Sequence, residues 1–145
     1  MERKIDGCAV VELDEQLIDR AALARARAEL GSAFARILGY FREDGPASVR
    51  AIEMAMRDGQ AAAIVVPAHT LKGEARQFGA HALGDAAERI EDHARRCVER
   101  HEAPDEIIPD VAALRTLFER TMSAIDGQCN PVRPRQPVVF GRRSG

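Results

Sequence analysis

The side chains best suited to chemistry lie in one short stretch of this chain, residues 68–80. Within it, His69 is followed by Lys72 and Gly73 about one helical turn later, and by Arg76 at the next turn. An imidazole is a nucleophile when one ring nitrogen keeps its lone pair, and nearby cations stabilise the oxygens of a phosphoryl group. The spacing therefore predicts a histidine that carries a phosphoryl group, with Lys72 and Arg76 as candidate phosphate contacts.

Helical periodicity predicts that this histidine is exposed. His69, Lys72 and Gly73 fall on a face beside the apolar stripe of a helix over residues 60–78. Lys72 is one of only two lysines among the 21 basic residues, which favours a specific role over chance, although a lone helical histidine is more often an ordinary surface residue. Gly73 costs about 0.5–1 kcal/mol relative to alanine in a helix interior. Either space for a partner or close helix packing would explain it. The apolar stripe consists of Ile64, Ala68, Leu71, Ala75 and Phe78.

The following helix supplies a candidate partner for His69. Gly79 predicts a left-handed cap at which the chain reverses. Residues equally far from that turn lie level on the two helices, so the counterpart of His69 is expected near residues 90–92. Glu91 lies there and could accept a hydrogen bond from Nδ1–H, which leaves Nε2 as the nucleophile. Arg95, one turn later, could add positive charge near the phosphoryl oxygens, or could form an ordinary surface ion pair with Glu91.

The rest of the chain predicts further amphipathic helices. Apolar periodicity and breaking residues predict helices over 15–20, 21–43, 46–59, 60–78, 80–102 and 106–126. Asp14 is the expected cap of the first, and Gly45-Pro46 the expected break before the third. Pro67 predicts that the fourth helix either bends at about 63–67 or begins anew there. Short connections between these helices predict an all-α fold, an up-and-down antiparallel four-helix bundle with additional N-terminal helices.

Composition limits the class of protein. A chain of 145 residues with 46% hydrophobic and 30% charged residues predicts one folded domain, which we assign to residues 1–126, before a basic, proline-containing tail over 127–145. Three scattered cysteines and the lack of a long apolar run predict a cytoplasmic protein that is not bound to membranes. The net charge is −2, but the tail over 127–145 holds four arginines and no acid, which leaves 17 basic and 23 acidic residues, or −6, for residues 1–126. This acidic body argues against a nucleic-acid-binding domain.

Other reactive groups form weaker patterns. His93, Cys97 and His101 recur every four residues and could place three metal ligands along one helix. Cys97 lies on the predicted buried stripe, however, and no fourth ligand is apparent, so we expect no metal site. The chain also lacks a glycine-rich nucleotide loop, and we expect no ATP-dependent kinase activity of its own.

The pattern around His69 resembles the histidine phosphotransfer (HPt) domain. The resemblance implies that His69 is the phosphoacceptor, that Lys72 helps neutralise the phosphoryl group and that Glu91 orients the imidazole. It also implies that the small residue at Gly73 gives a partner access, and that an apolar collar surrounds the site. The motifs that carry the resemblance are Ala68-His-Thr-Leu-Lys-Gly73, Phe78-Gly79-Ala80 and Ala86-Ala87-Glu88-Arg89-Ile90-Glu91, and the candidate collar residues are Leu13, Leu17, Ile18 and Val65.

The resemblance implies a phosphoryl carrier in a two-component phosphorelay rather than a conventional enzyme. The expected partners are response-regulator receiver domains and a sensor or hybrid histidine kinase. The receiver would supply Mg²⁺, the chain would need no cofactor of its own, and we expect a monomer. Two alternatives stay open: a non-catalytic adaptor that binds receivers or kinases through the same face, and the phosphorylatable domain of a larger chemotaxis-type histidine kinase.

Overall fold

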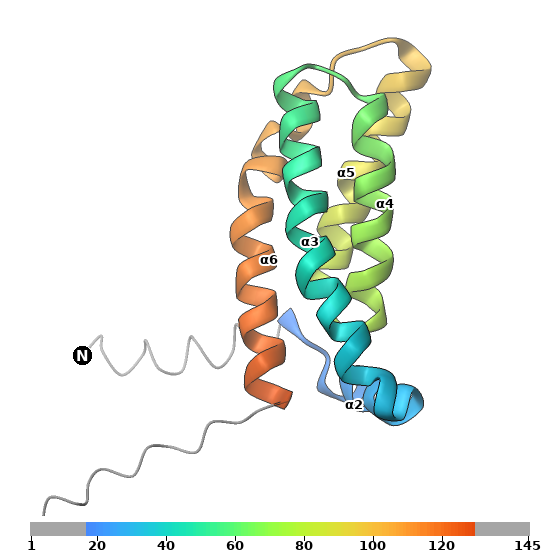
Figure 1. Cartoon of the computed structure of the whole chain (residues 1–145). Helices are drawn as coiled ribbons and strands as arrows, with labels where there is room; N and C mark the ends of the chain where they lie inside the picture. Colours follow the sequence, from blue (N-terminus) through green and yellow to red (C-terminus); the bar gives the residue numbers. More distant parts are fainter. Residues whose placement is uncertain (1–16, 130–145) are drawn as a thin grey trace, which may run out of the picture.

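Helices make up the described part of this chain. The computed structural model describes residues 17–129, which form α2 (Arg20–Leu30), α3 (Phe34–Arg57), α4 (Ala62–Gln77), α5 (His81–Arg100) and α6 (Ile108–Cys129) (Figure 1). Short 3₁₀ turns over Gly31–Ala33 and Asp105–Ile107 join α2 to α3 and precede α6. The all-α class predicted from the sequence is therefore confirmed for these residues.

The four longer helices pack against one another. Helices α3 and α5 each contact both α4 and α6, and the contact between α4 and α5 is the most extensive. Figure 1 shows the connection from α4 to α5 at the lower end of the molecule, where α2 also lies. The backbone N–H of Asp19 donates to the carbonyl of Gly79 at 2.9 Å, which ties the start of α2 to that connection. The pair α4–α5 carries the residues of chemical interest.

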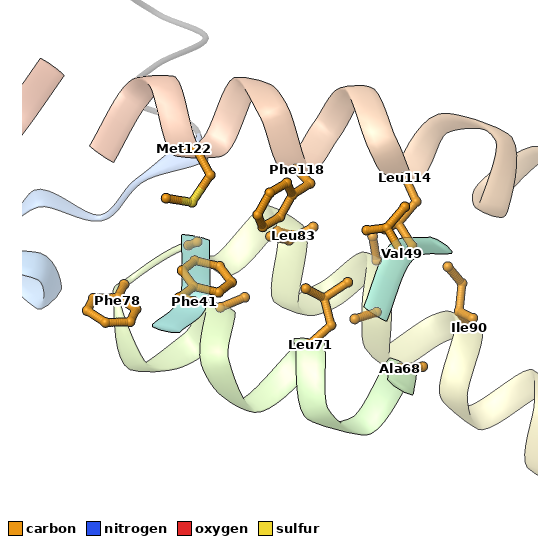
Figure 2. Close-up of a cluster of buried hydrophobic side chains, with 14 of the residues drawn as sticks. Phe41, Val49, Ala68, Leu71, Phe78, Leu83, Ile90, Leu114, Phe118 and Met122 are labelled. Carbon is orange, nitrogen blue, oxygen red and sulfur yellow. The ribbon is translucent and has the colours of Figure 1, made fainter. Parts of the chain in front are cut away.

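Aromatic and aliphatic side chains fill the space between these helices (Figure 2). Phe41 stacks on Phe78 with ring centroids 5.5 Å apart, and Phe118 meets Phe41 edge-on, also at 5.5 Å. Burial of a large apolar side chain contributes about 1.5–3 kcal/mol, so this cluster holds α3, α4 and α6 together. The predicted stripe of the His69 helix is confirmed, because each of its members is 0% exposed: Ile64, Ala68, Leu71, Ala75 and Phe78.

Helix α3 continues through Gly45 and Pro46, so the predicted break there is wrong. Pro46 lacks the N–H that would reach the carbonyl four residues earlier, which costs about 3 kcal/mol. The cost is offset because α3 buries Phe41 and Val49 on either side of it, at 1% and 0% exposure. A Cβ added at Gly45 would lie 2.2 Å from Cε1 of Phe118. Gly45 therefore allows close packing of α6 on α3 and does not end a helix.

The N-terminal helices have other boundaries than the periodicity predicted. The predicted helix over 21–43 is divided at Gly31, whose φ of 54° lies in the left-handed region that favours glycine. Helix α2 begins at Arg20 because Asp19 caps it, with Oδ1 accepting a hydrogen bond from the N–H of Ala22 at 3.1 Å. The proposed cap at Asp14 lies outside the described residues.

Helices α4 and α6 both continue through a residue that the sequence marked as a boundary. Pro67 lies inside α4, so of the two alternatives offered by the sequence, the one in which a new helix begins at Pro67 is wrong, and the bend at about 63–67 stays a prediction. Helix α6 continues through Gly127 to Cys129, past the predicted end at residue 126. The predicted left-handed cap after α4 is confirmed by the φ of 75° at Gly79. A Cβ there would also lie 2.8 Å from the carbonyl oxygen of Asp19, so the tie to α2 requires glycine as well.

Candidate functional site

His69 lies near the middle of α4, and 63% of its side chain is exposed. The turn at Gly79 folds α5 back along α4 and brings Glu91 level with it. The Nδ1 atom of His69 lies 3.0 Å from Oε2 of Glu91. The two geometric predictions, an exposed imidazole and a carboxylate within hydrogen-bonding reach, are therefore confirmed.

The Glu91 carboxylate is the centre of a small charge network. The residue is only 2% exposed, although its helix face borders solvent. Its Oε2 accepts hydrogen bonds from Nε and Nη2 of Arg95, at 3.1 and 2.7 Å, in addition to the contact with His69. Its Oε1 forms an ion pair with Nζ of Lys72 at 2.8 Å. Two cations and an imidazole therefore surround one nearly buried carboxylate.

These contacts keep Glu91 ionised. Burial raises the pKa of the Glu91 carboxyl, but hydrogen bonds from Lys72, Arg95 and His69 together outweigh burial and lower the pKa to about 2. An ionised carboxylate only accepts hydrogen bonds, so Nδ1 of His69 must be the donor. In the neutral imidazole the lone pair then resides on Nε2, the nitrogen that Glu91 does not engage. An imidazole held in this way can act as a nucleophile through Nε2.

Gly73 leaves open space beside His69. A Cβ added at Gly73 would meet no atom within 4 Å. Close packing of a second helix, the alternative explanation for this glycine, is therefore wrong. The open surface lies next to Lys72, whose side chain is 20% exposed. The arrangement leaves room for a partner to approach the imidazole.

Arg76 does not join the His69 network. Its guanidinium forms ion pairs with Asp85, at 3.2 Å, and with Glu88, both on α5. Gly84 leaves room for the Arg76 side chain, because a Cβ at Gly84 would lie 2.9 Å from Cγ of Arg76. These contacts tie α4 to α5 and hold Arg76 on carboxylates, and its contact with phosphate stays a prediction.

Arg95 forms the ion pair with Glu91 that its spacing offered as one of two alternatives. The sequence suggested a contact with phosphoryl oxygens, whereas its guanidinium donates two hydrogen bonds to Oε2 of Glu91. The alternative of an i,i+4 ion pair is the one that the structure contains. This pair differs from an ordinary surface pair because the Glu91 side chain is only 3% exposed.

The predicted apolar collar is largely absent from the exposed surface. Leu17 and Ile18 are buried at 7% and 2% exposure, because the segment before α2 packs into the core. Their assignment to an exposed docking surface is therefore wrong. Leu13 lies outside the described residues. Val65 is partly buried against the core and remains near the site.

A shallow hollow of about 270 Å³ lies between α4 and α5 on the side of Val65. Val98, which was not among the predicted site residues, lines this hollow and is 43% exposed. Helical spacing could have identified it, because Val98 lies three residues after Arg95 and seven after Glu91, on the same face of α5. The lining residues are Ala62, Val65, Arg95, Val98 and Glu99.

The weaker candidate sites have no supporting geometry. Within residues 17–129, no group of three His, Cys, Asp or Glu side chains is arranged to hold a metal ion. Cys97 is buried, and His93 instead lines a second hollow of about 310 Å³ with Arg96 and Glu106. No helix in the described part of the chain is long and apolar enough to cross a membrane.

Comparison with known proteins gives one match. The family model of the Hpt domain matches residues 36–124, which include His69, Lys72, Glu91 and Arg95 and make up more than half of the chain. Neither the curated proteins nor the solved structures contain a significant match. The chain therefore belongs to the Hpt domain family, whose members take part in phosphotransfer in two-component signalling.

Proposed function

We propose that this protein relays phosphoryl groups between aspartates of response-regulator receiver domains through a phosphohistidine at His69. One observation carries the proposal: an exposed imidazole whose Nδ1 is held 3.0 Å from a buried, ionised carboxylate. Open space at Gly73 supports access by a partner domain. The proposed partners are receiver domains together with a sensor or hybrid histidine kinase.

The chemistry follows from the tautomer that Glu91 selects. Nε2 of His69 attacks the phosphorus of a receiver's aspartyl-phosphate, the N–P bond forms, and the P–O bond to the aspartate breaks with the carboxylate as leaving group. The proton stays on Nδ1, and Glu91 stabilises the positive charge that develops on the ring. The reverse reaction passes the group to another receiver. The Mg²⁺ of this reaction would belong to the receiver, and the chain would act as a carrier without ATP-dependent activity.

The proposal includes a finer description of the fold and of the state of the protein. We take α3 to α6 as an up-and-down antiparallel four-helix bundle, and α2 as an additional N-terminal helix. The short connections and the contacts of α3 and α5 with both other helices support this assignment. The protein would act as a cytoplasmic monomer, with the domain over residues 1–126 and the basic tail over 127–145.

Transfer from a labelled receiver tests the proposal. Wild-type protein incubated with a ³²P-labelled phosphoreceiver should acquire an acid-labile, alkali-stable label, and H69Q should acquire none. H81Q is the matched control, because His81 is also exposed, at the start of α5, and this variant should be labelled normally. Binding of receivers without transfer to the wild-type protein would refute the relay and would indicate an adaptor instead.

A further inference from the structure

The contacts of Glu91 are divided between its two oxygens. Oε2 accepts hydrogen bonds from Nδ1 of His69 and from Nε and Nη2 of Arg95, whereas Oε1 forms an ion pair with Nζ of Lys72. Glu91 is nearly buried, so it cannot lose its counterions without a large cost in free energy. Any movement of Lys72 away from Oε1 therefore requires that another cation stay on the carboxylate.

Lys72 and Arg95 differ in how they could respond to a phosphoryl group on His69. Lys72 lies one turn after His69 on the same helix, and its flexible ammonium makes a single contact with Glu91. The guanidinium of Arg95 is held on Oε2 by two hydrogen bonds, from Nε at 3.1 Å and from Nη2 at 2.7 Å. The two-point contact resists displacement better than the one-point contact.

We propose that Arg95 is the permanent counterion of Glu91 and thereby frees Lys72 to move to the phosphoryl group on His69. Arg95 is a positioning residue in this scheme, since it acts through Glu91 and does not touch the phosphoryl oxygens. Without Arg95, the carboxylate would hold Lys72 as its remaining counterion. The inference rests on the proposed role of His69 as phosphoacceptor.

A small-molecule donor tests this inference without any receiver. With phosphoramidate, the bond between Nε2 and phosphorus forms, the donor's P–N bond breaks, and the amine of the zwitterionic donor leaves as ammonia. R95Q should slow this labelling about tenfold, the effect expected for loss of hydrogen bonds to a charged group. R95K, which keeps the charge without the two-point contact, should recover part of the rate.

The matched control is R96Q, which removes the same charge from the next position of α5. Arg96 contacts His93 and has no contact with Glu91, so R96Q should be labelled at the wild-type rate. Equal losses in R95Q and R96Q would overturn the inference, because they would indicate a general effect of charge. Thermal unfolding of both variants checks that each is folded.

Double-mutant cycles separate the proposed route from a direct contact between Arg95 and phosphate. In an E91Q background there is no carboxylate to neutralise, so R95Q should then have little effect on the rate. K72Q should slow labelling less in R95Q than in the wild-type protein, because Lys72 is already held by Glu91. An undiminished effect of R95Q in the E91Q background would overturn the inference and would support a direct contact.

The outcomes distinguish this inference from the proposed function. If phosphoramidate labels His69 with the expected dependence on Arg95 but no receiver transfers its group, the relay is wrong and the role of Arg95 stands. If phosphoramidate does not label the wild-type protein, the role of Arg95 is overturned, because no phosphohistidine forms for Lys72 to reach.

Discussion

Substitution of Gly45 by alanine should destabilise the protein, although alanine is the better helix former. Gly45 lies inside α3, where G45A would gain at most about 0.5–1 kcal/mol from helix propensity, because a residue with a Cβ is disfavoured in helical conformation directly before a proline such as Pro46. The added Cβ, however, would lie 2.2 Å from Cε1 and 2.4 Å from Cζ of Phe118. Carbon atoms in contact prefer about 3.5–4 Å, so the ring must move by more than about 1 Å.

The buried position of Phe118 limits that movement. Its ring is buried at 5% exposure and meets the ring of Phe41 edge-on at 5.5 Å. Overpacking costs about 1–3 kcal/mol, and a Cβ so close to a buried ring belongs to the upper part of that range, about 2–3 kcal/mol. After subtraction of a propensity gain of at most about 1 kcal/mol, we expect G45A to lower the free energy of unfolding by about 1–3 kcal/mol, which corresponds to a fall in Tm of roughly 3–12 °C for a domain of this size.

Urea denaturation followed by circular dichroism measures this difference. The matched control is G39A, in the same helix, because a Cβ at Gly39 would meet no atom within 4 Å. G39A should raise the free energy of unfolding by about 0.5–1 kcal/mol. The packing argument would be refuted if G45A were as stable as the wild-type protein, or if both alanine variants changed stability in the same direction.

Two further substitutions test the site and its surroundings. G73A should raise the free energy of unfolding by about 0.5–1 kcal/mol, because the added Cβ meets open space. The same variant should slow transfer from a receiver more than it slows labelling by phosphoramidate. Equal slowing of both reactions would contradict the proposed role of Gly73 in access by the receiver. Burial, and then the charge of Asp44, raise the pKa of Glu74 from 4.5 to about 7, so the folded state loses stability as the pH rises from about 4.5 through about 7. Between pH 4 and pH 8, the free energy of unfolding of E74Q should therefore rise by about 1 kcal/mol relative to that of the wild-type protein, as measured by urea denaturation. This value is smaller than the full pKa shift would give, because Glu74 is partly exposed to solvent. A stability difference that does not change with pH would contradict this assignment.

Local spacing was sufficient to predict the centre of the site. The period of the apolar residues in 60–78 gave the buried face, and therefore the exposed face with His69. The turn at Gly79 predicted that Glu91 lies level with His69, because the rise per residue is the same in both helices. The partners of long, flexible side chains were not predictable in this way. Arg76 pairs with Asp85 and Glu88 on the neighbouring helix, and this pairing depends on the spacing of α4 and α5 and on the small residue at Gly84.

The sequence by itself determined the helical class, the exposed imidazole and the carboxylate opposite to it, because these follow from periodicity within neighbouring segments. Only the tertiary structure decided that α3 continues through Pro46, since the burial that offsets the proline comes from helices distant in sequence. It also decided that Leu17 and Ile18 are buried, and that Gly45 serves contact with Phe118. The same holds for the burial of Glu91: its pairing with Arg95 within α5 follows from the i,i+4 spacing, but its side chain becomes nearly buried only once the helices have packed.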